Sequence, residues 1–433
     1  MSKKPLPIVT ATFDKIVGGG QALATLESGQ KLFAWGVLPG ETADVQITKK
    51  KSSLLEGVAT TIHQPSAERV EPRDPASYLS TSPWQVMDFA AEQHYKAALI
   101  EEAFELHDIV LPEPIEVYSD GELYGYRNKI EFSFWFDIDT QALSLAFFRR
   151  GSHGKITVDG TSLAAPEINA AAAEVLAALN RMGAVGRQLK TLLVRADARG
   201  NVTWQLYVKD ETFDVERFAQ ILGAKLERGE VIYSNPLSPA SVITKILTTD
   251  APAPLTDTLL GVDFQYATEG FFQINLPVYE QALRDMQRYV PTNTPVVDLY
   301  SGVGTIGLTI GGDDITLVEI NQSAVREMRR NIETLSRKNA RAVLAASENA
   351  LEYVSRDATI IVDPPRAGLH DAVVETLLSE APKRIVYLSC NPATQARDIK
   401  KLAEKYGIRA HRGYNFFPRT PHIEHLVVLD LKA

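Results

Sequence analysis

Hydrophobic and polar positions follow three successive patterns along the 433 residues of the chain. In residues 1–62, short strand-like runs are separated by glycine turns, which predicts a small β-barrel of about five strands in the style of an OB-fold. Residues 91–262 mix strand and helix patterns and predict a central α/β domain. From residue 263 to 433, apolar strands alternate with helices, a pattern typical of a parallel sheet covered on both faces.

Residues 63–90 differ from these stretches because polar residues and prolines replace any regular period. The prolines are Pro65, Pro72, Pro75 and Pro83. Proline and polar clusters mark loops, so this stretch is expected to be a linker between the barrel and the central domain. The fold expected for the whole chain is multidomain, with an OB-like barrel, a central α/β domain and a C-terminal α/β domain of the Rossmann type.

Charge and composition narrow the classes of function. Lys and Arg total 45 against 54 Asp and Glu, which gives a net charge of −9 and argues against indiscriminate nucleic-acid binding. A local basic cluster such as Lys49-Lys50-Lys51 is still suited to phosphate contact, or is a solvated turn. The chain shows neither a signal sequence nor an apolar run long enough for a membrane, so we expect a cytoplasmic protein.

Cys390 is the only cysteine, which excludes a disulfide scaffold, an iron–sulfur cluster and a zinc-thiolate site. The strand pattern of residues 384–389 and the helix pattern after residue 393 place it at the carboxyl end of a strand, just before a helix N-terminus. Ligands bind at that edge of α/β sheets, and a helix N-terminus lowers the pKa of a thiol. Cys390 is therefore either a nucleophile or, as lone cysteines often are, a small buried apolar residue.

A glycine loop follows the apolar strand that contains Asp298. Gly302, Gly304 and Gly307 permit a tight turn and a close approach of a nucleotide-type ligand, and Glu319 ends the next strand, where an acidic residue accepts hydrogen bonds from ribose hydroxyls. The glycine spacing also fits a nicotinamide-dependent oxidoreductase. Asp298 just before the loop is instead typical of S-adenosylmethionine enzymes, with its carboxylate near the charged amino-acid end of the cofactor.

Two further motifs carry carboxylates. In Asp363-Pro364-Pro365-Arg366, the prolines force the chain out of the sheet, so that Asp363 can position the amide-like edge of a base and Arg366 can hold a phosphate. In His422-Ile423-Glu424-His425 no helical metal motif is present, and no metal site is expected. Glu424 fits a general base better, because one carboxylate and one thiol are what addition across a pyrimidine requires.

Cations and aromatic rings alternate in the central region. Arg127 precedes the aromatic strand 130–136, and Arg149 lies in the run 147–153, which interleaves phenylalanines with cations. Guanidinium groups hold phosphates and rings stack on unpaired bases, so the composition suits single-stranded RNA. The alternative is that the rings belong to the core of a sheet.

In their order along the chain, these motifs resemble the RNA uracil-C5 methyltransferases of the TRAM-containing class that modifies 23S ribosomal RNA. The segments that carry the resemblance are 271–275, 298–304, 363–366, 389–392 and 421–425, and it extends over nearly the full length. The resemblance implies an N-terminal TRAM barrel (1–62), a linker (63–90), a central RNA-binding domain (91–262) and a Rossmann-like methyltransferase domain (263–433).

The resemblance, together with the motifs, also assigns residues. Cys390 is the expected nucleophile, which attacks C6 of the uracil so that C5 can take the methyl group, and Glu424 is the expected base for the C5 proton. The expected S-adenosyl-L-methionine site consists of Gln273, Asp298, Tyr300, Gly302, Gly304, Thr305, Glu319 and Asp363. The expected RNA-binding residues are Gln273, Asp363, Arg366, Arg127 and Arg149.

The chain departs from many of these relatives in lacking four cysteines that hold an iron–sulfur cluster, three near residues 80–88 and one near Asp159. No cluster is therefore expected here. The expected substrate is 23S rRNA, and tRNA is the alternative, since some archaeal-type tRNA enzymes also carry TRAM barrels. A non-catalytic RNA-binding protein of ribosome assembly is the alternative from another class. A monomer is expected.

Overall fold

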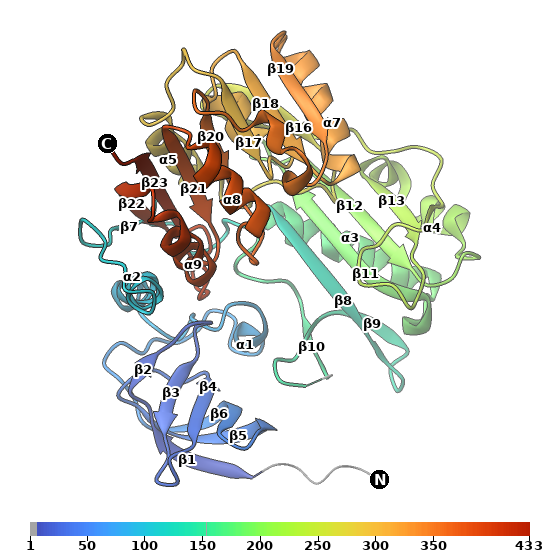
Figure 1. Cartoon of the computed structure of the whole chain (residues 1–433). Coiled ribbons are helices and arrows are strands. Elements are labelled where there is room, and N and C mark those ends of the chain that lie inside the picture. The colour runs from blue at the N-terminus through green and yellow to red at the C-terminus, as the bar shows by residue number, and fades with distance from the viewer. Residues whose placement is uncertain (1–6, 153) are drawn as a thin grey trace.

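The computed structural model of the protein describes residues 7–152 and 154–433, and three sheet-based parts follow one another in space (Figure 1). Residues 1–6 of the expected barrel and His153 of the expected RNA-binding run lie outside the described residues. The expectation of a multidomain α/β chain is confirmed. Within the described ranges, no helix is both long and apolar enough to cross a bilayer.

The N-terminal sheet has six strands, where about five were expected, in the order β1-β5-β6-β4-β3-β2. Apolar side chains at alternate strand positions form its core. On β5, Ala43, Val45 and Ile47 are buried, while the residues between them are partly exposed. The strands are β1 (Ile8–Thr12), β2 (Lys15–Ile16), β3 (Ala22–Thr25), β4 (Lys31–Trp35), β5 (Thr42–Lys50) and β6 (Leu54–Gln64).

The expected linker, residues 63–90, is a packed segment. It contains the end of β6 and the short helix α1 (Tyr78–Thr81), and Trp84, Val86 and Met87 are buried in the core of the N-terminal sheet. The indole N–H of Trp84 donates to the carbonyl of Gly20 at 3.0 Å. The prolines prevent regular structure, but the apolar side chains between them still gain from leaving water.

The central sheet has the strand order β10-β9-β8-β11-β12-β13-β14. Helices α3 (Pro166–Met182) and α4 (Val215–Leu222) cover one face and share its apolar core. Phe132 and Phe134 point into that core, whereas Trp135 and Phe148 are exposed. The strands are β8 (Lys129–Asp137), β9 (Ala142–Phe148), β10 (Lys155–Val158), β11 (Leu189–Ala196), β12 (Val202–Val208), β13 (Gly229–Tyr233) and β14 (Lys245–Ile246).

The C-terminal sheet has the order β19-β18-β17-β20-β21-β23-β22-β7, and its first five strands are parallel. Two separate apolar clusters cover its faces, and neighbouring residues such as Val296 and Val297 belong to different clusters. Its strands are β17 (Val296–Leu299), β18 (Ile315–Glu319), β19 (Ala340–Leu344), β20 (Thr359–Val362), β21 (Arg384–Ser389), β22 (Tyr406–Tyr414) and β23 (Glu424–Leu431).

Helices on both faces complete this layered arrangement, which matches the pattern of strands and helices expected from residue 263 onward. α5 and α6 contribute to one apolar cluster, and α8 and α9 contribute to the other. The helices are α5 (Leu276–Gln287), α6 (Thr305–Ile310), α7 (Gln322–Thr334), α8 (Asp371–Glu380) and α9 (Pro392–Leu402); the 3-10 turns are η1 (Gly186–Gln188), η2 (Gly223–Arg228), η3 (Ser347–Asn349) and η4 (Leu351–Tyr353).

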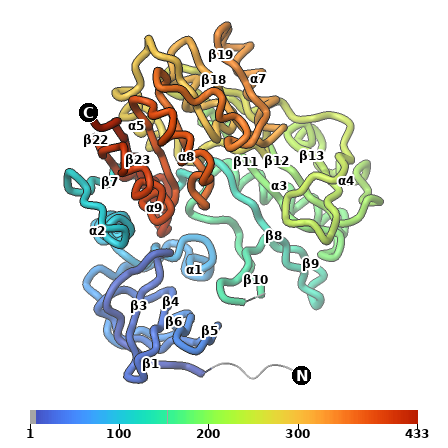
Figure 2. The backbone as a smooth tube through the Cα atoms, in the orientation of Figure 1, coloured from blue at the N-terminus to red at the C-terminus, as the bar shows by residue number. Residues whose placement is uncertain are grey.

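Segments that were expected in the central domain pack with the C-terminal part instead. Strand β7 (Val117–Tyr118) pairs with β22, and helix α2 (Phe89–Glu105) packs on α9, between the N-terminal and C-terminal sheets (Figure 2). The hairpin of β15 (Leu255–Leu259) and β16 (Val262–Tyr266) packs into the C-terminal core. β7 covers the edge of β22 that would otherwise be unpaired, which is the physical reason for this difference.

Candidate active site

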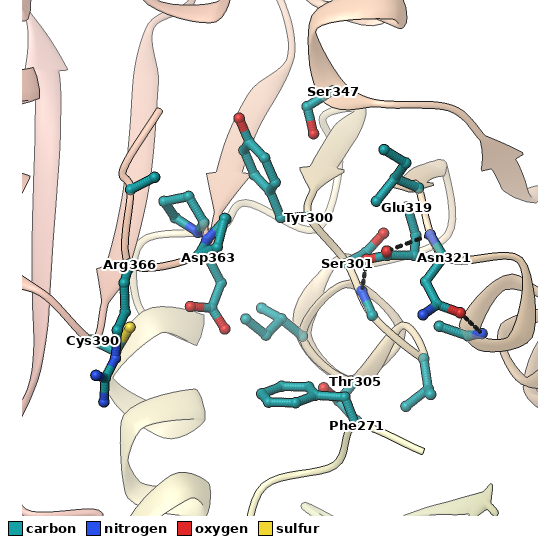
Figure 3. A pocket seen from close by; sticks show the side chains of 18 of the residues that line it. Phe271, Tyr300, Ser301, Thr305, Glu319, Asn321, Ser347, Asp363, Arg366 and Cys390 are labelled. Atoms are coloured by element: carbon teal, nitrogen blue, oxygen red, sulfur yellow. Dashed lines mark hydrogen bonds between the residues drawn. The ribbon is translucent and has the colours of Figure 1, made fainter. Parts of the chain in front are cut away.

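A cavity of about 1390 Å³ opens at the carboxyl ends of the parallel strands of the C-terminal sheet. Figure 3 shows Cys390, Arg366 and Asp363 at one end of it and Glu319 with Asn321 at the other. Ligands bind at this edge of α/β sheets, where the sequence placed the motifs. The expected site residues that line the cavity are Gln273, Tyr300, Gly302, Thr305, Glu319, Asp363, Arg366, Cys390 and Glu424.

Asp298 supports the glycine loop from beneath. It is fully buried on β17 and does not line the cavity, and its Oδ2 accepts the N–H of Gly307 in α6 at 2.9 Å. Its Oδ1 is buried without a partner. Above it, Tyr300, Gly302 and Gly304 have positive φ values of 63°, 57° and 88°, so the loop turns sharply between strand and helix. The carboxylate thus fixes the loop that forms the cavity floor.

The tight contact between α6 and Asp298 gives a first prediction. A Cβ at Gly307 would lie 2.5 Å from Leu317 Cδ2 and 2.9 Å from Asp298 Oδ2. Gly307→Ala is therefore expected to lower the free energy of unfolding by about 1–3 kcal/mol, measured by urea denaturation. The control is Gly407→Ala, where a Cβ has no heavy atom within 4 Å. Equal losses in the two variants would contradict the packing argument.

Glu319 organises the other end of the cavity. Its carboxylate accepts the N–H of Gly302 at 2.9 Å and that of Asn321 at 2.7 Å, as the dashed lines in Figure 3 show. Asn321, which the sequence did not single out, caps α7 by accepting the N–H groups of Ser323 and Ala324. An acidic residue at the end of the second strand, beside the glycine loop, fits the ribose of a nucleoside-type ligand.

Three chemical groups converge at the opposite end. Asp363 directly follows β20 and Cys390 directly follows β21, and these strands are parallel neighbours. Glu424 begins β23, which pairs with β21 so that Ser389 lies opposite His425; the next position along this register brings Cys390 beside Glu424. Segments 363–366, 389–392 and 421–425 therefore meet in one cavity, as the ordered motifs predict.

Burial and mutual repulsion shift the pKa values at this end. Burial raises the pKa of Asp363 to about 7. Burial and the charge of Asp363 raise the pKa of Glu424 well above its usual range, although Arg366 opposes this. A carboxylate with a raised pKa binds a proton more strongly than an ordinary glutamate does, which suits a general base.

The expectation that the helix N-terminus lowers the pKa of the Cys390 thiol is wrong for the ligand-free protein. Burial, together with the charges of Glu424 and Asp363, raises the pKa of the thiol to about 12, and Arg366 lowers it only in part. The N-terminus of α9 offers the sulfur little support, because Pro392 at its first position has no N–H to donate. Cys390 is a neutral thiol until the surrounding charges change.

The carboxyl groups of Asp298 and Asp363 predict a pH dependence of stability. Asp298 and Asp363 both have an ordinary pKa of 3.8, which the fold raises to about 8 and about 7, respectively, mainly by burial. In this window the folded state binds more protons than the unfolded state, so the free energy of unfolding falls as pH rises from about 4 to 8. Denaturant titrations of the ligand-free chain across this range measure it. Asp298→Asn should flatten the slope, and an unchanged slope would contradict the assignment.

Arg366 contacts His422, which the sequence analysis weighed only as a metal ligand. Its Nη2 lies 3.2 Å from Nδ1 of His422, and both residues line the cavity. Burial and the charge of Arg366 lower the pKa of His422 to about 4, so the imidazole is neutral. Tyr279 also lines the cavity, with its hydroxyl 2.8 Å from that of Thr305. Nothing in the local sequence around Tyr279 signalled this position.

The two expected RNA-binding arginines of the central region do not line the cavity. Arg127 forms a bridge with Ala164, and its charge contributes to the lowered pKa of His422. Arg149 is exposed beyond the end of β9, where its N–H donates to the carbonyl of Gly154. The RNA roles of both arginines stay predictions.

Gly304 is another expected site residue that does not line the cavity. It lies beneath the cavity surface, as the N-cap of α6.

His425 is directed away from the cavity. Its Nδ1 lies 2.8 Å from the side-chain oxygen of Gln395, and its Nε2 lies 3.3 Å from Nδ1 of His411. Among the residues that the structure describes, no three His, Cys, Asp or Glu side chains are grouped to hold a metal ion. His422 and His425 therefore take up different environments, and the chemistry of the cavity is that of the thiol and the carboxyl groups.

The fold corresponds to that of a solved methyltransferase over nearly its full length. The crystal structure of Pyrococcus abyssi tRNA (uracil-54, C5)-methyltransferase in complex with S-adenosyl-L-homocysteine superposes with a TM-score of 0.77 at 23% sequence identity, covering 97% of this chain and 99% of that chain. The two chains thus share a multidomain α/β architecture with mixed sheets.

The family follows from the sequence. The model of the tRNA (Uracil-5-)-methyltransferase family matches residues 90–432, and the chain belongs to this family. An uncharacterized RNA methyltransferase of Enterococcus faecalis is 29% identical over 429 residues, covering 92% of this chain and 92% of that protein. One of Nitratidesulfovibrio vulgaris is 27% identical over 448 residues, covering 97% and 95%.

The family assignment decides between the alternatives that the glycine loop left open. The chain is an S-adenosyl-L-methionine-dependent RNA uracil-C5 methyltransferase, not a nicotinamide-dependent oxidoreductase or a non-catalytic binding protein. The residues fit this cofactor. Glu319 and the glycine loop suit its nucleoside. The carboxyl group of Asp363 in the cavity, and that of Asp298 buried beneath the loop, would lie near its charged amino-acid end.

Proposed function

We propose that this enzyme methylates C5 of a specific uridine in RNA through a covalent bond between Cys390 and C6 of the uracil, with Glu424 as the general base. One observation carries the proposal: Cys390, directly after β21, and the buried Glu424, at the start of the paired strand β23, line the same cavity as the glycine loop. A carboxyl group beside a thiol is needed for addition to a pyrimidine and for its reversal.

The chemistry follows from these residues. Cys390 gives up its proton and its sulfur bonds to C6, which makes C5 a nucleophilic enolate carbon. S-adenosyl-L-methionine, when bound, supplies the methyl group that C5 takes up. Glu424 then removes the C5 proton, and the C6–sulfur bond breaks as the uracil regains its double bond. Since the free thiol is neutral, its proton must first pass to a neighbouring carboxylate or to water.

Residues of the cavity would hold the two substrates at separate ends. Glu319, Tyr300, Gly302 and Thr305 would hold the cofactor, with Gln273 and Asp363 between cofactor and uracil, and Asp298 acting from beneath the loop. Arg366 is exposed at the cavity and suits a phosphate. A stacked uracil hides both faces, so the target must flip out or lie in an unpaired loop, at a cost of a few kcal/mol.

The N-terminal sheet is proposed to be a TRAM domain that binds RNA together with the central sheet. The two are joined near the turn after β9: the guanidinium of Arg150 lies 4.2 Å from the ring centroid of Trp35 and donates to the carbonyl of Leu79. The exposed residues Phe148 and Arg149 lie beside this contact and suit base stacking and phosphate binding. The cytoplasmic location and the monomeric state stay predictions.

The RNA class has two candidates. The resemblance of the ordered motifs supports 23S rRNA, whereas the structural likeness to a tRNA (uracil-54, C5)-methyltransferase favours tRNA. Incubation with tritiated S-adenosyl-L-methionine and total RNA tests the activity, and mapping 5-methyluridine in rRNA and tRNA from a deletion strain identifies the class. Label in neither RNA would contradict the proposal, and loss of one mapped site identifies the target.

A further inference from the structure

The wall of the cavity that carries Gln273 has no regular structure of its own. Residues 268–274 connect β16 to α5 without forming a helix or strand, and Glu269, Gly270, Phe271, Phe272 and Gln273 all line the cavity. The ring of Phe272 anchors the segment in the C-terminal core, where it stacks on Tyr266 with 4.2 Å between the ring centroids. The position of the rest of the segment, and that of the Gln273 side chain, depends on what its carbonyl and amide groups contact.

The central sheet supplies these contacts from the face that α3 and α4 do not cover. Arg195 on β11 and Lys129 on β8 are paired across neighbouring antiparallel strands, so their side chains share that face. Thr203 and Gln205 of β12 extend the same face, and they bond to Thr268 Oγ1 at 2.9 Å and to the Glu269 carboxylate at 2.8 Å. The central sheet meets the C-terminal part at this face (Figure 1).

Arg195, Lys129 and Asn128 donate hydrogen bonds to most of the backbone carbonyls of the segment. The fully buried guanidinium of Arg195 donates to the carbonyls of Thr268 at 3.5 Å, of Gly270, and of Phe272 at 2.9 Å. Lys129 Nζ donates to the carbonyl of Glu269 at 3.0 Å and to that of Gly270 at 3.4 Å. Asn128 Nδ2 donates to the carbonyl of Gln273 at 3.0 Å.

Placing the partly buried ammonium of Lys129 beside the fully buried guanidinium of Arg195 costs free energy, which argues against an incidental arrangement. Burial and the charge of Arg195 lower the pKa of Lys129 to about 8, and burial lowers that of Arg195. Carbonyl dipoles and the carboxylates of Glu269 and Glu327 offset part of this cost. The ring of Tyr266 lies beneath the guanidinium, 4.5 Å from its centre.

We propose that Arg195 and Lys129 are positioning residues that act through segment 268–274 and set the place of Gln273 in the cavity, where it lies between the cofactor and the uracil. The central sheet is then part of the cofactor site's framework as well as a surface for RNA. This inference rests on the proposed role of Gln273 in cofactor binding. Neither cation touches the reacting groups, since neither lines the cavity.

The test measures the dissociation constant of S-adenosyl-L-homocysteine by calorimetry on the full chain, without RNA. Arg195→Lys keeps the charge but offers a single ammonium for carbonyls that lie apart, and Lys129→Met keeps the length without donors. Each is expected to weaken binding about tenfold, as the loss of hydrogen bonds from a charged group predicts. The control is Val194→Ala, a fully buried neighbour on β11 that faces the central core, which should change binding less than about twofold.

A double-mutant cycle separates positioning from a general loss of stability. In a Gln273→Ala background, the effect of Arg195→Lys or Lys129→Met should shrink to less than about twofold, because the residue through which it acts is gone. Wild-type affinity in both single variants, undiminished effects in the Gln273→Ala background, or an equal loss in Val194→Ala would overturn the proposal. If Arg195→Lys does not fold, Lys129→Met carries the test. Failure of the wild-type chain to bind the ligand would instead count against the proposed cofactor site.

Discussion

Cys390→Ser is expected to abolish methyl transfer while RNA and cofactor binding persist. Serine replaces the sulfur with a hydroxyl of much higher pKa and lower nucleophilicity, so addition to C6 fails and C5 never becomes nucleophilic. We expect the rate of tritium transfer from S-adenosyl-L-methionine to RNA to fall by at least about a thousandfold, the scale seen when a covalent nucleophile is removed. The change is small in volume, and the side chain is only partly buried, so the fold should be kept.

The controls for this variant are binding measurements. S-adenosyl-L-homocysteine should bind Cys390→Ser as it binds the parent chain, and filter binding should show unchanged affinity for RNA. Because no other cysteine exists in the sequence, no second thiol can replace the missing one. Undiminished methyl transfer would remove the nucleophile assignment, and loss of both binding activities would indicate misfolding.

The sequence predicted the location of the active site because the strands and helices that place its residues can be recognised from local sequence. Cys390, Asp363 and Glu319 each follow or end an apolar strand, and carboxyl ends of parallel strands share one edge of a sheet. That rule needs only the order of strands and helices. It therefore placed residues that are distant in sequence in one cavity, without any knowledge of their contacts.

What the sequence could not predict depends on side chains brought together by the fold. The pKa of Cys390 is set by Glu424 and Asp363, so the local expectation from the helix N-terminus gave the wrong sign. Lys96 on α2 is another case: its fully buried ammonium lies 3.3 Å from Glu92 and donates to Asn415, which ties α2 to the segment before Glu424. A lysine in a helix pattern ordinarily indicates an exposed face.

The same tertiary contacts explain the shifted boundaries. Val117 and Tyr118 carry no strong strand signal, and they form β7 because the edge of β22 is available to them. Trp84 lies between prolines in a stretch that reads as a loop, yet a pocket at Gly20 receives its ring and accepts its N–H. In both cases the partner surface, which is distant in sequence, decides the outcome.

Glu424→Gln is expected to stop the reaction after methyl transfer and to trap the enzyme on its RNA. The amide keeps the shape of the side chain in its buried position but cannot accept the C5 proton, so the sulfur cannot be eliminated. The product should be a protein–RNA adduct that survives denaturing gel electrophoresis. With tritiated S-adenosyl-L-methionine, the label should migrate with the adduct, because C5 has already received the methyl group.

The double variant Cys390→Ser/Glu424→Gln is the matched control, and it should form no adduct because the bond to C6 is missing. Glu424 lies beside Asp363, whose raised pKa of about 7 makes it the other carboxyl group able to accept a proton at this end of the cavity. Normal turnover of Glu424→Gln without an adduct would therefore refute Glu424 as the base and direct attention to Asp363. A trapped adduct in Glu424→Gln that disappears when Cys390 is also changed requires both residues to act on the same uracil.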